Sequence, residues 1–299
     1  MTADYSTTAT YLSTGAFPVR NLEPILERAH ALGIRQLEVS SDVAHHPDPL
    51  GVLQRWAAHF DFLVHNYFPA PARPFVLNLA SVDPTLIEAS RRHCIRAMGI
   101  AAALGAPFYS VHAGFAANPS VKHLGASWSE LAIVPRARAV EVFRHSLDLL
   151  LSEAERLGLR LLIENNVVVR RNAPDGRNAM LLCAEPDEMI ALAEAYRGAP
   201  FAYLIDVGHL AVSAHSLGFS AQAALEAILP WVEALHLSDN DGLVDDNRPF
   251  GPDAWFIPWL DRLPDAIRVI EAYNLSLDDM RRCYAALGQE LQLPLDAVS

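Results

Sequence analysis

The chain has 299 residues, of which 52% are hydrophobic and 19% are charged, and its formal net charge is −12. This composition is too apolar for a disordered chain and supplies enough apolar side chains for a large core. The acidic balance argues against a nucleic-acid-binding protein, because such proteins use basic residues to displace counterions from phosphates. We therefore expect a folded globular protein without a nucleic-acid partner.

The cysteines and the apolar segments indicate where the protein resides. Cys94, Cys183 and Cys283 are far apart and form no Cys-x-x-Cys pair. This pattern excludes a disulfide framework and a thiolate zinc site, and it is typical of a reducing compartment. Residues 1–17 lack the basic segment and the long apolar run of a secretory signal. Glycines and a proline interrupt the Ala-rich residues 97–117, which do not predict a membrane span. We expect a cytoplasmic protein with no membrane partner.

Short β-rich runs alternate with helical runs along the chain, which indicates an α/β protein. A loop of about twenty residues after the fourth predicted strand exceeds the usual connection length, as functional loops often do. In chain order, the first half predicts the strand Tyr11–Phe17, the helix Asn21–Leu32, the strand Gln36–Ser40, the helix Pro49–His59, the strand Phe62–His65, a helix that begins at Asp83-Pro84, and the strand Phe108–His112.

The second half continues the same alternation, with long loops after its first and third strands. In chain order, it predicts a helix through residues 140–151 that ends before Gly158, the strand Arg160–Glu164, the helix Glu185–Tyr196, the strand Ala202–Asp206, the helix Ala221–Ile228, the strand Ala234–Leu237, a short helix at Trp255–Leu263, the strand Ile267–Glu271, and a helix from Ser276 to about Leu291.

The predicted elements repeat one unit, a strand followed by a helix. Eight strands in 299 residues give about 37 residues per strand and helix, the size of a unit in a (β/α)8 barrel. The alternative is a doubly wound open sheet, but the Gly-x-Gly-x-x-Gly fingerprint of that fold is absent after the first strand. We predict a (β/α)8 TIM barrel, with residues 1–299 as a single domain.

Acidic residues and histidines occur at the ends of most predicted strands. The C-terminal ends of barrel strands converge on one face, where active sites are found, so residues far apart in sequence would meet there. A single His or Glu at such a position is more often structural. Burying several carboxylates together without a cation is costly, however. The residues are, in chain order, Glu38, His65, His112, Glu164, Asp206, His236 and Glu271.

Carboxylates and imidazoles together suit a divalent metal such as Mn, Co, Mg, Zn or Fe. The aliphatic residues before each acidic residue indicate that Glu164, Asp206 and Glu271 close buried strands. We therefore predict a divalent metal cofactor, with these three carboxylates and His236 as ligands, and with His65 and His112 as further candidate ligands.

Four of the strand ends lie in motifs that resemble a known group of proteins. The motifs are Leu-Leu-Ile-Glu164-Asn, Ile-Asp206-Val-Gly-His209, Leu-His236-Leu-Ser-Asp239 and Val-Ile-Glu271. Their order is similar to the successive strand motifs of the xylose isomerase-like TIM-barrel superfamily. That superfamily includes sugar isomerases, ketose 3-epimerases, inosose dehydratases and the endonuclease IV family. The resemblance covers nearly the whole chain.

The resemblance to epimerase-like members implies roles for individual residues. The Glu, Asp, His and Glu of strands five to eight bind the metal in those members, and here they correspond to Glu164, Asp206, His236 and Glu271. The two glutamates there also act as acid and base on the substrate. His209, three residues after the strand-six Asp, is implied to contact the metal or the substrate.

Other segments resemble endonuclease IV, which binds three metals. His65-Asn-Tyr67 and Val111-His112-Ala-Gly114 are similar to segments whose histidines hold its additional metals. Its next motif is Asp-x-His followed by Gly, whereas this chain has Asp245-Asp246-Asn247 and then Gly251. Asp245 is thus a candidate ligand, and Asn247 stands where the family has a His.

Two classes of enzyme follow from these residues. The first is a metal-dependent isomerase or epimerase of a small sugar, polyol or sugar derivative, which removes a proton alpha to a carbonyl and forms a metal-stabilised enediolate. The alternative is a multinuclear phosphoester hydrolase, or a multi-iron oxidative enzyme on the same barrel. A barrel that serves only as a scaffold is a third possibility, but it would not need the buried carboxylates.

The candidate substrate-binding residues include one loop arginine. Arg170 either clamps a phosphate or carboxylate group of the substrate or is a solvated loop charge. The full set is His112, His209, Asn247 and Arg170. The sequence does not determine the substrate, the metal or the number of metals, and it leaves open whether the chain forms a homo-oligomer.

Overall fold

Eight parallel strands form the centre of the protein and confirm the predicted TIM barrel. The computed structural model describes residues 9–40, 42–128 and 130–291. Each strand pairs with the next one in sequence, and β8 pairs with β1 to close the barrel. The strands are β1 Thr10–Ser13, β2 Gln36–Val39, β3 Asp61–His65, β4 Phe108–His112, β5 Arg160–Glu164, β6 Phe201–Asp206, β7 Val232–Leu237 and β8 Ile267–Ile270.

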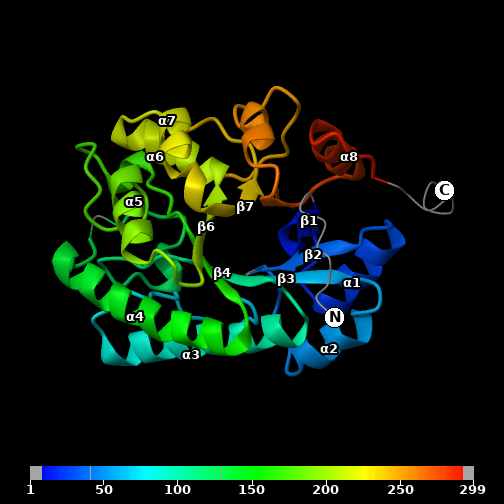
Figure 1. Cartoon of the computed structure of the whole chain (residues 1–299), viewed down its shortest axis with the longest axis horizontal. Coiled ribbons are helices and arrows are strands. Elements are labelled where there is room, and N and C mark those ends of the chain that lie inside the picture. The colour runs from blue at the N-terminus through cyan, green and yellow to red at the C-terminus, as the bar shows by residue number, and fades with distance from the viewer. Residues whose placement is uncertain (1–8, 41, 129, 292–299) are drawn as a thin grey trace.

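Helices surround the barrel (Figure 1). The α-helices are α1 Leu22–Ala31, α2 Pro49–Trp56, α3 Pro84–Ala103, α4 Arg136–Leu157, α5 Pro186–Ala195, α6 Val207–Leu217, α7 Ala221–Ile228 and α8 Leu277–Ala286. Short 3-10 helices lie at η1 Thr14–Ala16, η2 Val121–His123, η3 Arg170–Asn172, η4 Leu229–Trp231 and η5 Ile257–Arg262. Among the described residues, none of these helices combines the length and the apolar character needed to cross a bilayer.

The main error of the sequence analysis is α6, which follows β6 directly and was not predicted. Asp206 ends the strand and also caps the helix, because its Oδ1 accepts a hydrogen bond of 2.7 Å from the backbone N–H of His209. The helix ends at Leu217 and is followed by the capping residue Gly218, whose φ is +80°. A single residue thus terminates one element and starts the next, which leaves no loop for the sequence pattern to reveal.

The largest differences in the bounds of the predicted elements concern three of them. The first strand was expected to reach Phe17 but ends at Ser13, whose hydroxyl caps η1 by accepting from the Gly15 N–H. The last helix was expected to continue to about Leu291 but ends at Ala286. The short helix expected at Trp255–Leu263 is present as the 3-10 helix η5, which covers only Ile257–Arg262.

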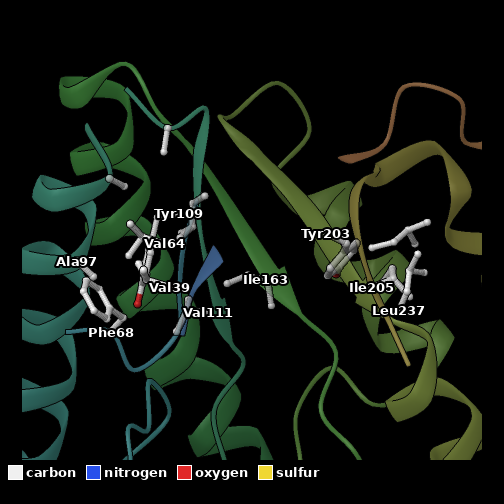
Figure 2. Close-up of a cluster of buried hydrophobic side chains, with 14 of the residues drawn as sticks. Val39, Val64, Phe68, Ala97, Tyr109, Val111, Ile163, Tyr203, Ile205 and Leu237 are labelled. Atoms are coloured by element: carbon white, nitrogen blue, oxygen red, sulfur yellow. The ribbon is translucent and has the colours of Figure 1, made fainter. Parts of the chain in front are cut away.

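The side chains along each strand point alternately outward, toward the helices, and inward, into the barrel. Val64, Ile163 and Leu237 pack outward against residues of the helices, in the larger core (Figure 2). A second buried cluster contains strand side chains and fills the barrel interior. Its buried members are Tyr11, Leu63, Phe108, Leu162, Ala202, Leu204, Ala234 and Val269. Because successive side chains of a strand point to opposite faces, each residue two positions beyond an interior member also points inward.

His93 on α3 is a buried histidine that should make stability depend on pH. Its ring stacks on Tyr67 at 5.2 Å, and its Nε2 has no hydrogen-bond partner. Burial lowers the pKa of His93 from 6.5 to about 4. The unfolded chain therefore binds the proton more tightly, so the stabilisation is complete above pH 6.5 and is lost as the pH falls toward 4.

We expect His93→Phe to remove this pH dependence while keeping the aromatic contact. Between pH 7 and pH 5, the wild type should lose about 1–2 kcal/mol more unfolding free energy than the variant. Urea unfolding at the two pH values measures the difference. An equal loss in both proteins would contradict the prediction.

Candidate metal centre

The carboxyl ends of five strands bring predicted ligands into the barrel mouth. Each ligand lies two residues beyond an interior apolar residue, so it points inward as well. The pairs are Leu63 and His65, Leu162 and Glu164, Leu204 and Asp206, Ala234 and His236, and Val269 and Glu271. Alternation along the strands is therefore what gathers these side chains at one end of the barrel.

Glu164 lies at the centre of the group and is fully buried. Its Oε2 is 3.1 Å from Nε2 of His65 and 3.3 Å from Nε2 of His112. Its Oε1 is 3.4 Å from Nδ1 of His236. Burial alone would raise the pKa of Glu164, but the surrounding histidines His112, His65 and His236 hold the pKa well below its ordinary value. Glu164 is thus an ionised carboxylate inside the barrel.

Glu164, Asp206, His236 and Glu271 form the set that fits a divalent metal best. Each offers one ligand atom, and these atoms all lie within 4.8 Å of one another. Nδ1 of His236 is 2.7 Å from Oε2 of Glu271. Both oxygens of Glu164, Oδ2 of Asp206 and Nδ1 of His236 are buried without a hydrogen-bond partner. Buried carboxylate oxygens without donors are costly, and a cation would satisfy them.

The pKa shifts indicate the same crowding of acidic groups. Burial, together with the neighbouring charges of Asp245 and Glu271, raises the pKa of Asp206 to about 8 against the opposing effect of His209. Burial lowers the pKa of His236, but the carboxylates of Glu271 and Glu38 reverse this and raise it well above 6.5. The raised pKa values mean that Asp206 and His236 bind protons, which reduce the repulsion between the acidic groups. A divalent cation could replace these protons.

Two overlapping groups extend the site. His65, His112 and Glu164 form one, and Glu38, His65 and His236 form the other. Burial lowers the pKa of His112 to about 4, so its ring is neutral and suited to binding a metal. The structure thus brings together His65 and His112 with the four main candidate ligands, as the sequence predicted.

Glu38 is the residue that the ligand prediction omitted, although the sequence pattern places it on a strand. Its two carboxylate oxygens each lie 3.1 Å from Nε2 of His236, and both residues are fully buried. A carboxylate on the far nitrogen of a metal-binding histidine fixes the orientation and tautomer of the ring. The inward position of Glu38 between the outward Leu37 and Val39 could have revealed this role.

Replacing Glu38 with Gln should weaken metal binding without removing a ligand of the main group. A neutral amide accepts the Nε2–H of His236 more weakly than a carboxylate does, which makes the ring a poorer donor, so we expect about 10- to 100-fold weaker binding of Mn²⁺. Competition with a fluorescent chelator measures the affinity. Glu27→Gln, an exposed change on α1, is the matched control. Equal affinity in the two variants would refute the role of Glu38.

His209 and Asp245 form a pair at the edge of the site. Nε2 of His209 is 3.1 Å from Oδ2 of Asp245, and its Nδ1 is 2.9 Å from the backbone oxygen of Asn165. Nε2 also lies 3.8 Å from Oδ2 of Asp206. Burial lowers the pKa of His209, but Asp206 and Asp245 outweigh it and raise the pKa well above 6.5. Both His209 and Asp245 therefore lie beside the candidate ligands and line the cavity.

Asn247 and Arg170 do not line the cavity over the site. The side-chain amide of Asn247 is buried and donates a 3.2 Å hydrogen bond to the backbone oxygen of Glu271. The guanidinium of Arg170 donates to the backbone oxygen of Ser216 at 3.1 Å, and its neighbour Arg171 lines the cavity instead. The structure thus does not place these two side chains with the other substrate-binding candidates.

A cavity of about 720 Å³ opens above the group. Its inner end is lined by His65, His112, His209, Asp245 and Glu271. The long loops after β4 and β5 form much of its outer wall. The volume lies in the range of pockets that bind small molecules. The arrangement can therefore hold a metal and a small ligand side by side.

Known structures share this architecture. A D-tagatose 3-epimerase-like protein superposes with a TM-score of 0.68 at 17% identity, over 91% of this chain and 93% of that chain. A Thermus thermophilus protein soaked with ZnCl2 gives 0.64 at 24% identity, over 93% and 96%. D-psicose 3-epimerase from Clostridium cellulolyticum, with D-tagatose, gives 0.61 at 13% identity, over 93% and 96%. Identities this low indicate a shared fold.

The sequence itself identifies the family. No curated protein matches the chain significantly. Residues 57–266 match the profile of a family described as xylose isomerase-like TIM barrel. That segment runs from the end of α2 to the turn before β8 and includes Glu164, Asp206 and His236. The chain is a member of the xylose isomerase-like TIM-barrel family.

Proposed function

We propose that the protein is a divalent-metal-dependent isomerase or epimerase of a small sugar, polyol or sugar derivative. The observation that carries the proposal is the pair Glu164 and Glu271. These two carboxylates approach the same nitrogen of His236, at 3.4 Å and 2.7 Å, and Glu271 lines the cavity. The epimerases among the similar structures support this class of reaction.

The surroundings of each glutamate suit it to a different proton-transfer step. Glu271 lines the cavity and is 5% exposed, so it can reach a proton on the carbon next to a substrate carbonyl. Glu164 lies behind it between His65 and His112, which stabilise its charge and can exchange a proton with it. A bound divalent cation would supply Lewis-acid polarisation of the substrate oxygens.

Histidines at the inner end of the cavity are placed to orient the substrate. The side chain of His112 lines the cavity and is 26% exposed. It can therefore bond to a substrate hydroxyl. His209 faces the same cavity and is fixed by Asn165 and Asp245. Two fixed imidazoles beside the carboxylates would hold the reacting carbon in place.

The experiment that tests the proposal is proton exchange. We expect the Mn²⁺-loaded protein, incubated with ketoses and keto-polyols in D2O, to introduce deuterium next to the carbonyl of at least one compound. Proton NMR detects the loss of the carbon-bound proton. Screening of six-carbon ketoses and inositol derivatives together would cover the proposed substrate class. No exchange with any of them would contradict an isomerase.

A second candidate is a multinuclear phosphoester hydrolase. The cluster of His65, His112 and Glu164 favours it, because this group could hold a second metal beside the first. It predicts two or three metals per chain in elemental analysis, whereas the isomerase needs one. Bound iron together with oxygen consumption would instead indicate a multi-iron oxidative enzyme.

A further inference from the structure

The outer part of the cavity is mostly apolar. Tyr67 and Phe75 pack edge to face with ring centroids 5.4 Å apart, and Phe115 and Trp128 do the same at 5.2 Å. Aliphatic side chains from the loops complete the wall. We call this region the apolar chamber and define it by Tyr67, Phe75, Phe115, Leu124, Trp128 and Val169.

The wall of the apolar chamber has a core of its own. Trp128, Met180 and Leu181 belong to a separate hydrophobic cluster between the loops that follow β4 and β5. The backbone N–H of Ala116 donates to the oxygen of Met180 at 2.6 Å, which ties the two loops together. The indole N–H of Trp128 donates to the backbone oxygen of His123 at 2.8 Å. The chamber is therefore preformed.

The mouth of the cavity exposes apolar side chains to solvent. Val121, Leu124 and Val244 line the cavity and are 47%, 57% and 38% exposed. They come from two different loops, so the rim is apolar on more than one side. Exposed apolar side chains at the mouth of a cavity usually mark a site that binds a ligand with an apolar part.

The charges around the cavity disfavour an anionic substrate. Among the described lining residues, Arg171 is the one Lys or Arg side chain, and its guanidinium donates to the backbone oxygens of Gly125 at 2.9 Å and Ala126 at 3.4 Å. Asp245 and Glu271 add acidic groups, and Asp245 lies 3.1 Å from the ring of His209 and offsets its charge. Phosphate and carboxylate groups are usually bound by free Arg or Lys donors. A neutral ligand fits this cavity better.

We propose that the substrate is a neutral molecule with a hydroxylated ketone at one end and an apolar, ring-containing group at the other. This inference rests on the proposed isomerase function, which places the ketone beside Glu164 and Glu271. The apolar group would then extend into the apolar chamber. The cavity volume of about 720 Å³ leaves room for both parts, whereas a single six-carbon sugar would leave the aromatic wall uncovered.

The first test examines the chamber without relying on catalysis. The neutral naphthalene dye prodan should bind the Mn²⁺-loaded protein at one site, with a blue shift of its emission. Leu124→Asp should weaken this binding about tenfold, because it places a charge on the apolar rim. Ile133→Asp is the matched control, since Ile133 is 53% exposed on the same loop and does not line the cavity. Equal dye affinity in the two variants would overturn the proposal.

The second test compares three forms of each ketose in the proton-exchange assay. The forms are the free ketose, its 6-phosphate and its neutral 6-O-benzyl ether. We expect the benzyl ether to have a kcat/KM at least about tenfold above both others, and to displace prodan at lower concentration than they do.

The outcomes separate the two proposals. Exchange that is as fast with free ketoses or phosphates as with benzyl ethers overturns the neutral, apolar substrate and leaves the isomerase in place. Dye binding that depends on Leu124, without exchange in any ketose, supports the apolar chamber and overturns the isomerase.

Discussion

Glu164→Gln should abolish turnover while leaving the barrel folded. Gln has nearly the same shape but carries no charge, so the change removes a proton-transfer group and a candidate metal ligand together. Loss of a general acid or base costs about 10²–10⁴ in rate, and loss of the ligand adds to it. We expect the fall in kcat to be at least about 10³-fold. The proton-exchange assay on the best ketose measures it.

Controls separate this effect from a change in folding. The variant should keep the circular dichroism spectrum of the wild type, because the apolar clusters that pack the barrel do not include Glu164, which is the last residue of β5. Glu155→Gln removes an exposed carboxylate from α4 and should retain full activity. Undiminished turnover in Glu164→Gln would refute the assignment of this residue.

The second large effect is the stabilisation of the protein by metal. The candidate ligand atoms lie within 4.8 Å of one another in Glu164, Asp206, His236 and Glu271. Repulsion between the acidic groups therefore destabilises the folded protein when no metal is bound. A metal present at 1,000 times its Kd stabilises the folded state by about 4 kcal/mol. For a chain of this size we expect Mn²⁺ to raise Tm by roughly 5–10 °C over protein treated with EDTA.

Asp206→Asn gives the sharpest comparison for this measurement. Asn is also a good N-cap, so the start of α6 is preserved when the acidic ligand is lost. The shift of Tm with Mn²⁺ should therefore nearly disappear. Asp278→Asn changes a side chain that is 91% exposed and should leave the shift intact. The metal assignment fails if Mn²⁺ stabilises Asp206→Asn as much as the wild type.

Local patterns predicted the barrel strands well but missed contacts that cross elements. Glu164, Asp206 and Glu271 were recognisable because each ends an apolar run. α6 was missed because Asp206 serves as strand end, candidate ligand and helix cap at once. Hydrophobic periodicity indicates where an element runs, but an element that begins without an intervening loop gives no boundary signal.

The alternation of side chains along each strand by itself determined that the carboxylates and histidines face the barrel interior. Tertiary structure alone decided that Glu38 supports His236 across the barrel, and that Arg170 bonds to Ser216 instead of lining the cavity. The physical reason is distance along the chain. A strand sets the direction of its own side chains, whereas contacts between distant strands and loops exist only after the barrel has closed.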